Sequence, residues 1–280
     1  LKEFVFTRPV TLSGGGMFPM GDDMKLMKGR IRFDASAGRV RYPLLGTTLD
    51  LGRTKGEVLI SPQWVVVDKM MGTIWDGTFT GRVLAQIDDG DALNGSFVLQ
   101  DMNLTSIGKS YDKKMEKATV HGAIEFSSKG GNMNSIQAKG EAALVHGDLV
   151  EIPLFGFLGE ALSNYIPGLG HLINYKISRA DCDFSIEKGY VRTSNFAAQG
   201  SNMSLEGGGW IRLSDLQVNS DFKLGLRGFP GFITSPVFLL AGGLFQVRGT
   251  GPLSNVSWNF APFSGGKAPV PPASVSTRKR

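Results

Sequence analysis

Few residues in this chain have the types and spacing that catalysis or metal binding requires. The three histidines, His121, His146 and His171, lie far apart, and none belongs to an H-E-x-x-H metal-binding motif. The G-x-S-x-G turn of α/β-hydrolases does not occur. The acidic run at 88–91 lacks the downstream glutamate of an EF-hand calcium loop. We therefore expect no enzymatic activity, no bound metal and no cofactor.

Two aspartates flank the single cysteine. Asp181 and Asp183 lie two residues apart, so a strand would point both to the same side, and no acid–base partner accompanies them. Cys182 has no second cysteine with which to form an intramolecular disulfide. Because the neighbouring residues alternate like a strand, we interpret the aspartates as surface residues and Cys182 as a small packed side chain.

The composition indicates a mainly β fold. The 280 residues include 38 glycines, about twice the usual share of roughly 7%. Glycine is unfavourable inside helices and common in tight turns and bulges. Two dipeptides of the first half, Asp89-Gly90 and Asn94-Gly95, predict type I′ hairpin turns. Strands are predicted around them, over 57–60, 64–67, 78–85, 96–104 and 119–126.

Most of the net positive charge lies at the C-terminus. The chain carries a net charge of +5, and the segment 264–280 supplies four positive charges and no acidic residue. The remaining +1 gives no basic-aromatic pattern typical of a nucleic-acid interface. The segment is also rich in Pro, Ala, Ser and Gly, so we predict a disordered tail. We interpret it as solvated, with contact to anionic lipid or nucleic acid as the alternative.

A helical pattern interrupts the β sequence between 151 and 177. Apolar residues recur there with helical spacing, and Pro167 would end the helix. The predicted apolar face comprises Leu154, Phe155, Leu158, Leu162 and Tyr165. We favour a helix that caps the sheet and protects its edge, with binding to a membrane surface as the alternative.

The clearest alternation lies in the second half and predicts a long strand over 216–226. Polar residues occupy the opposite side of this strand, which would be about 35 Å long at roughly 3.3 Å per residue. The predicted apolar side consists of Leu216, Val218, Phe222, Leu224 and Leu226. Such a side could line an open groove for an acyl chain, or it could be the closed core of a β-sandwich.

Four segments of the chain resemble the C-terminal region of the AsmA-like family. They are 138–158, 183–193, 200–213 and 245–256, with sequences such as Phe245-Gln-Val-Arg-Gly-Thr-Gly-Pro-Leu-Ser-Asn-Val. The resemblance implies a curled antiparallel sheet with an apolar groove. It also implies a Gram-negative envelope protein held at the inner membrane and linked to phospholipid movement and outer-membrane integrity. No stretch of 18 apolar residues occurs, so we expect any anchor to lie upstream of residue 1.

These observations lead to one set of expectations. The fold class is mainly β, a long antiparallel curled sheet or half-open barrel with an apolar groove and a short amphipathic helical insert. We expect a hairpin-rich region over 1–150, the helical insert over 151–177, the AsmA-like β region over 178–263 and the tail over 264–280. The expected function is phospholipid binding in the periplasm, without catalysis, in lipid transport or outer-membrane biogenesis. The alternatives are an envelope scaffold that contacts other proteins, and a surface adhesin or glycan binder.

Overall fold

The computed structural model describes most of the chain and divides it into two compact units. Unit 1 is Leu1–Gly140 and unit 2 is Glu141–Arg280. The described residues are 5–17, 27–44, 47–87, 92–111, 115, 117–129, 135–145, 150–151, 176–201, 203–226, 244–253 and 255–262.

The described chain is mainly β, as the composition predicts, with one short helix, α1 (Leu104–Ser110). The strands of unit 1 are β1 (Val5–Phe6), β2 (Thr11–Met17), β3 (Lys28–Asp34), β4 (Arg39–Leu44), β5 (Thr47–Ile60), β6 (Trp64–Ile74), β7 (Gly77–Gln86), β8 (Ala92–Asn103) and β9 (Thr119–Ser128). β10 (Gln137–Val145) spans the division between the units. Those of unit 2 are β11 (Val150–Glu151), β12 (Lys176–Glu187), β13 (Tyr190–Gly200), β14 (Met203–Arg212), β15 (Gln217–Leu226), β16 (Leu244–Pro252) and β17 (Ser257–Pro262).

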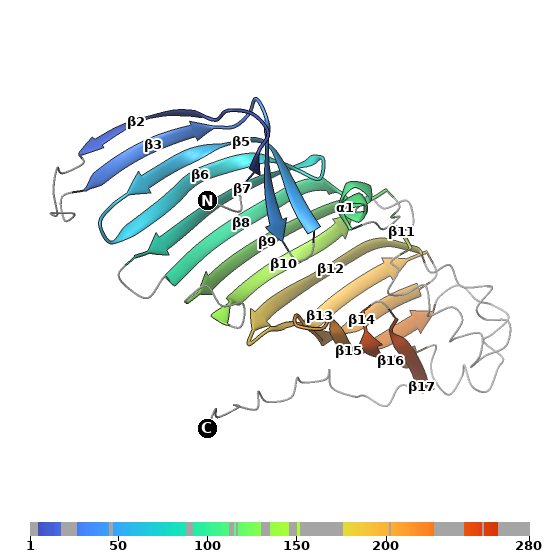
Figure 1. Ribbon diagram of the computed structural model, residues 1–280. Helices are drawn as coiled ribbons and strands as arrows, with labels where there is room; N and C mark the ends of the chain where they lie inside the picture. The colour runs from blue at the N-terminus through green and yellow to red at the C-terminus, as the bar shows by residue number, and fades with distance from the viewer. Residues whose placement is uncertain are drawn as a thin grey trace, which may run out of the picture. The chain divides into compact units, whose positions relative to one another are not determined.

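The strands of unit 1 pair antiparallel, mostly with their neighbours in the chain. β5 to β9 pair in sequence order, and β5 also pairs with β3 along 55–60 and with β4 along 47–52. β2 pairs with β3, and β1 pairs with β4. Figure 1 shows β2, β3 and β5 to β9 side by side. The strands predicted within 57–126 are confirmed.

The hairpin turns of unit 1 differ from those predicted. β6 and β7 are joined by Trp75 and Asp76, both with positive φ (48° and 61°), which is the geometry of a type I′ turn. The predicted turn at Asn94-Gly95 is wrong, because both residues lie inside β8, opposite Leu84 and Val83. The predicted turn at 89–90 falls outside the described residues.

Helix α1 follows β8 directly and was not predicted. The Asn103 side chain caps its N-terminus by accepting a hydrogen bond from the Thr105 N–H at 2.9 Å. Near its other end, Trp75 Nε1 donates to Ser110 Oγ at 3.0 Å and ties the helix to the β6–β7 turn. A helix of seven residues is too short to show a repeated apolar period in the sequence.

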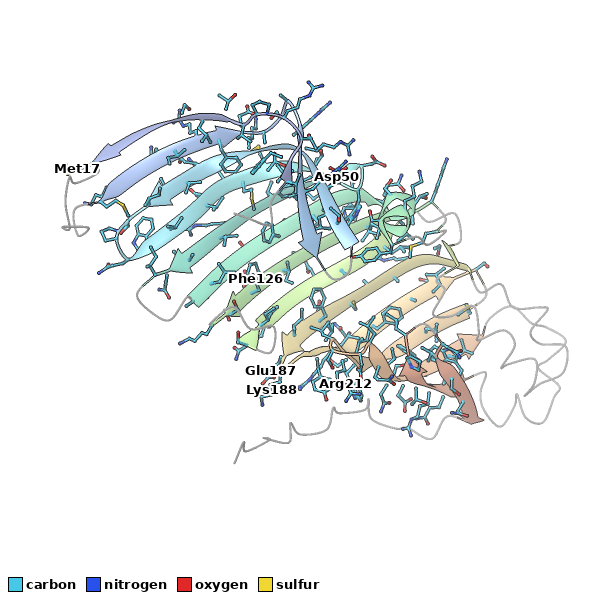
Figure 2. The ribbon with its side chains drawn as sticks, in the orientation of Figure 1. Met17, Asp50, Phe126, Glu187, Lys188 and Arg212 are labelled. Carbon is cyan, nitrogen blue, oxygen red and sulfur yellow. The ribbon has the colours of Figure 1, made fainter. Side chains whose placement is uncertain are left out.

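In unit 2, β12 to β17 pair antiparallel in chain order. The β12–β13 hairpin turns at Lys188 and Gly189, which have φ of 52° and 77° (Figure 2 labels Glu187 and Lys188). The long strand predicted over 216–226 is β15, which begins at Gln217. On the polar side of β15 the buried Asp221 carboxylate accepts from Gln246 Nε2 at 2.7 Å and from Arg248 Nη2 at 3.1 Å.

None of the helices in the described part of the chain combines the length and apolar character that a transmembrane segment requires.

Candidate functional site

One side of the unit 1 sheet carries a continuous row of apolar residues across its strands. Directly paired residues of an antiparallel sheet point to the same side, so the register assigns each side chain to a face. We call one set the apolar face of unit 1. It consists of Leu12, Ile31, Phe33, Val58, Ile60, Val65, Val67, Met70, Ile74, Phe79, Val83, Leu93, Phe97, Leu99, Ile124 and Phe126.

The opposite side of the same strands is mainly polar and charged. Its polar residues are Lys28, Arg30, Arg32, Asp34, Lys55, Glu57, Asp68, Thr80, Arg82, Ser96, Gln100 and Glu125, and we call this side the polar face of unit 1. It also carries the apolar Leu59, Val66, Leu84 and Val98, of which Val66 is buried. The two sides of the unit 1 sheet therefore differ in character, one mainly apolar and the other mainly polar.

The apolar face of unit 1 is only partly buried. Ile31, Phe33, Val58, Phe97 and Phe126 all keep some exposure to solvent. Leu12, at the edge on β2, is 66% exposed. Apolar side chains of an ordinary core are fully covered. Across β3 to β9, the described part of the chain therefore leaves this face partly open.

Four phenylalanine rings on the apolar face lie over glycines of the neighbouring strand. The directly opposite pairs are Phe33 with Gly56, Phe79 with Gly72, Phe97 with Gly81 and Phe126 with Gly95. A Cβ atom added to any of these glycines would come within 2.8 Å of the facing ring. Glycine therefore allows each ring to lie flat against the neighbouring strand, so that few side chains project from this face.

Three β-bulges keep the apolar residues on one side. β5, β6 and β8 each contain one residue more than the paired strand, at Arg53, Lys69 and Asp101. All three residues have positive φ (47°, 50° and 55°). One extra residue reverses the alternation of a strand. Apolar residues on both sides of each bulge therefore share a face, as Val67 and Met70 do.

One end of the apolar face is covered and forms a small core. Ile74, Phe79 and Met102 are buried there, and Leu51 of β5 and Ile107 of α1 pack against them. The bend of β5 at Arg53 brings Leu51 into this cluster. Phe97 packs against the same cluster and stacks on Phe126, with ring centroids 6.1 Å apart, and both rings stay partly exposed (Figure 2 labels Phe126).

The described side chains of β15 that were predicted to line a groove are more buried than most of the apolar face of unit 1. Val218, Phe222 and Leu224 are buried, with 5%, 6% and 1% exposure. Leu216 lies in the turn before β15 with φ of 54° and is 48% exposed. The side chain of Leu226 lies outside the described part, as does the whole predicted helix face of Leu154, Phe155, Leu158, Leu162 and Tyr165. The prediction that Val218, Phe222 and Leu224 share one side of the strand is confirmed. Their role in lipid binding stays a prediction.

The buried side of β15 belongs to a closely packed surface of unit 2. Phe222 contacts Phe196 and Trp258, with ring centroids 5.4 and 6.2 Å apart. Leu205 and Val247, on the strands that flank β15, are fully buried. The apolar side of unit 2 is thus a packed core around Phe222 and Leu224, while Ile186, Val191 and Ile211 on the same side keep partial exposure.

Metal-ligating side chains do not cluster in the part of the chain that the structure describes. No group of three or more of them lies together there. His121 Nδ1 accepts a hydrogen bond from the Asp101 N–H at the β8 bulge, a structural contact. Burial, and then the nearby Asp183 and Asp181 carboxylates, raise the pKa of the Cys182 thiol, which makes it a poor nucleophile.

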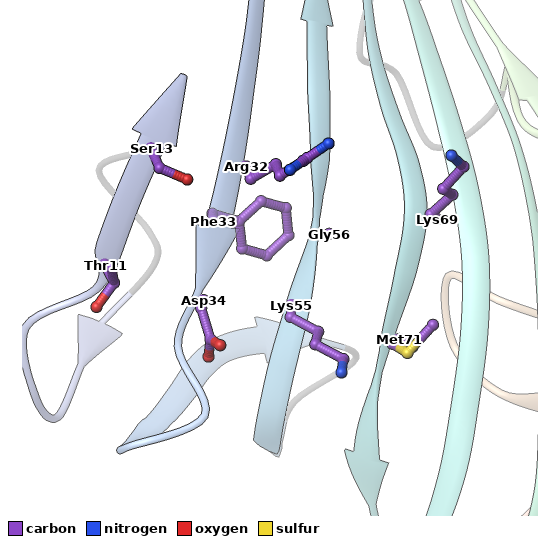
Figure 3. Close-up of a pocket in the computed structure, with 9 residues that line it drawn as sticks. All are labelled: Thr11, Ser13, Arg32, Phe33, Asp34, Lys55, Gly56, Lys69 and Met71. Carbon is purple, nitrogen blue, oxygen red and sulfur yellow. The ribbon is translucent and has the colours of Figure 1, made fainter.

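Two shallow hollows lie along the edge of the unit 1 sheet near β2 and β3. Figure 3 shows the first, of about 390 Å³, where Phe33 lies beside Gly56 and the cations Arg32, Lys55 and Lys69 surround it. The second, of about 360 Å³, lies between β3, β5 and the start of β6. Sequence reading did not locate either of them.

A sequence signal for the apolar face exists, although it was not used. Glycine and phenylalanine recur two residues apart in successive strands, as in Gly77-Thr-Phe79-Thr-Gly81 and Gly95-Ser-Phe97. Placed on adjacent antiparallel strands, this spacing puts rings opposite glycines.

Compared with known proteins, the chain matches no family model, no curated sequence and no solved structure.

Proposed function

We propose that this chain is a non-enzymatic lipid-binding protein whose apolar face of unit 1 receives an acyl chain. The observation that carries this proposal is the partial exposure of a continuous apolar surface from β3 to β9. Soluble proteins rarely leave large contiguous apolar surfaces uncovered without an interaction that uses them.

The energetics of lipid transfer favour such a surface. Each methylene exposed to water costs about 0.8 kcal/mol, so a chain of about 16 carbons costs on the order of 12 kcal/mol. A carrier offsets this cost through apolar contact alone, without any catalytic group. The rings that lie over Gly56, Gly81 and Gly95 offer flat apolar contact along several neighbouring strands.

The proposed setting is the periplasm of a Gram-negative bacterium. There the protein would support phospholipid transport between envelope membranes or outer-membrane biogenesis, anchored at the inner membrane and in contact with other envelope proteins. The resemblance of 138–158 and 245–256 to the AsmA-like family supports this setting. The binding surface itself is proposed in unit 1, before most of the segments that carry the resemblance.

A scaffold function is the second candidate, and the core of unit 2 favours it. Val218, Phe222 and Leu224 are already covered by protein, so β15 offers no open surface to a ligand. A chain whose apolar sides were all covered in this way would contact other envelope proteins through its exposed surface and would carry no lipid.

Photocrosslinking separates the two functions. A photoreactive phenylalanine analogue replaces Phe97 on the apolar face, and in a second protein it replaces Val98, the next residue, which points to the polar face and is 42% exposed. After expression in a Gram-negative host and irradiation, mass spectrometry should detect phospholipid attached at 97 and little at 98. Equal labelling at both positions, or none at either, would contradict lipid binding by this face.

A matched pair of charge substitutions gives a second test. Val83→Asp places a carboxylate on the apolar face and Val98→Asp places one on the polar face of the adjacent strand. Phospholipid extracted from the purified Val83→Asp protein should fall severalfold, with little change for Val98→Asp. Circular dichroism of both variants shows whether each still folds. Undiminished lipid in a folded Val83→Asp protein favours the scaffold.

A further inference from the structure

Positive charge is concentrated in one part of unit 1. Segment 28–55 contains seven Lys and Arg residues and two Asp, a net charge of +5, while the whole chain also carries +5 and four of those charges are in the tail. The rest of the chain is therefore net negative. On β3, Lys28, Arg30 and Arg32 all point to the polar face of unit 1 and are exposed.

A buried carboxylate holds two of these cations at the surface. The Glu57 side chain is only 9% exposed, and its Oε1 lies 3.5 Å from Arg30 Nε and 3.4 Å from Arg32 Nε. One carboxylate between two guanidinium groups leaves an excess positive charge. Lys28, Lys55 and Lys69 are exposed on either side and add three positive charges. Asp34, directly paired with Lys55, offsets one of them, and Asp68 forms an ion pair with Arg82.

Apolar and aromatic side chains lie beside these cations. Met17, on edge strand β2, is paired with Lys28 and is 62% exposed. Trp64 and Leu59 line the same hollow as Lys28 and Arg30. Lysine and arginine together with tryptophan and exposed apolar residues are typical of protein surfaces that bind at the interface of a bilayer. A nucleic acid would use the charge but gain little from Met17.

We propose that this basic surface, made of Met17, Lys28, Arg30, Lys55, Trp64 and Lys69, docks on an anionic phospholipid bilayer. The cations contact the headgroup phosphates, and Met17 enters the interfacial region. The surface is on the side of the sheet opposite to the apolar face of unit 1. Membrane docking is therefore an activity beyond the proposed acyl-chain binding, and either can fail without the other.

Vesicle co-sedimentation of the full chain tests the proposal. The vesicles are phosphatidylcholine with and without phosphatidylglycerol, at low and high salt. The variant Lys28→Gln/Lys55→Gln/Lys69→Gln keeps the Glu57 ion pairs, and the control Lys109→Gln/Lys117→Gln/Lys139→Gln removes the same charge from exposed lysines elsewhere. Binding to anionic vesicles should fall roughly 100-fold in the first variant and little in the control. Met17→Ser should weaken vesicle binding but leave heparin binding unchanged.

Several results would overturn membrane docking by this surface. If the two triple variants bound anionic vesicles equally well, Lys28, Lys55 and Lys69 would not form the binding surface. If the protein bound vesicles with and without phosphatidylglycerol equally well, it would not recognise the lipid charge. Loss of binding on replacement of Lys267, Arg278, Lys279 and Arg280 by Gln alone would assign it to the tail. Binding of heparin, with none to either vesicle, would identify a polyanion site instead.

Discussion

The Phe97 ring on β8 lies over Gly81 on β7, its directly paired neighbour, and fills the space where a side chain would stand. The same relationship recurs at Phe33, Phe79 and Phe126 with their own glycines. The glycines of this sheet are therefore packing residues. Their partners supply the side-chain surface that the glycines lack.

The first prediction concerns Gly81→Ala. The new Cβ would come within 2.6 Å of Phe97 Cε1 and 2.9 Å of the Ser96 carbonyl oxygen. Because a ring and a strand backbone must both shift, we expect a loss of about 1–3 kcal/mol in the free energy of unfolding. Urea denaturation followed by circular dichroism measures it. Gly15→Ala is the control, since nothing lies within 4 Å of its added Cβ. Backbone entropy alone would make either substitution neutral or stabilising, so equal losses for both would show that contact with the ring does not set the effect.

The second prediction concerns the bulge at Lys69. This residue holds a φ of 50°, which β-branched side chains adopt only with strain. Lys69→Val should lower the free energy of unfolding by roughly 1–2 kcal/mol, whereas Lys69→Gly should leave it unchanged or raise it. Lys55→Val provides the control, because Lys55 itself has no positive φ and occupies a strand position where valine is favoured. A Lys69→Val protein as stable as the Lys55→Val protein would mean that the bulge relaxes at no cost.

Strict alternation made some elements predictable. In β15, Val218, Phe222 and Leu224 share one side with only the small Ser220 between them, so the strand and its buried side could be read directly. The bulges could not be read in this way. Lys69 and Asp101 are ordinary charged residues whose left-handed backbone leaves no mark in composition. Asn94-Gly95 misled for a related reason: Gly95 is required under the Phe126 ring, not in a turn.

The candidate site was harder to predict than the strands. Alternation identifies an apolar side but does not say whether distant parts of the chain cover it. Leu224 and Phe97 both lie on apolar sides, yet Leu224 is 1% exposed while Phe97 stays partly open. Leu224 lies between β14 and β16 beside the fully buried Leu205, so the difference depends on how closely each sheet is packed. It therefore emerged only from the three-dimensional arrangement.

The third prediction concerns the ion pair in the β14–β15 turn. Arg212 Nε donates to Asp215 Oδ1 at 2.8 Å and holds the pKa of the Asp215 carboxyl below its usual range (Figure 2 labels Arg212). A folded-state pKa below the unfolded one stabilises the fold at higher pH, and this contribution is lost as pH falls through the folded value. Carboxyl NMR titration should show the Asp215 pKa rising in Arg212→Gln.

Asp34 supplies an internal reference in the same titration. Hydrogen bonds from Ser36, not from an arginine, lower its pKa. It should therefore keep the same pKa in Arg212→Gln. A shift of both carboxyls would point to a general change in the protein, and a shift of neither would show that the Arg212 contact does not persist in solution.

The fourth prediction concerns the reactivity of Cys182. Burial raises the pKa of its thiol, followed by the charges of Asp183 and Asp181, so little thiolate forms near neutral pH. The folded protein should react with a disulfide reagent more slowly than the same chain in urea, and its rate should keep rising at a pH where the unfolded chain has reached its plateau. Because the folded state disfavours the thiolate, stability should fall as pH rises from the unfolded pKa toward the folded one.

Substitution of the neighbouring charges separates the two causes. Asp181→Asn removes one negative charge and should shift the rate profile modestly toward lower pH, while burial keeps it above that of the unfolded chain. Asp183→Asn is a less direct choice, because the Asp183 carboxylate also accepts a hydrogen bond from Asn195 at 2.7 Å. Asp101→Asn, on a bulge of unit 1, serves as the distant control. If Cys182 in the folded protein reacts as fast as in urea, the thiol is open to solvent, and the apolar side of unit 2 on which it lies is not the closed core described above.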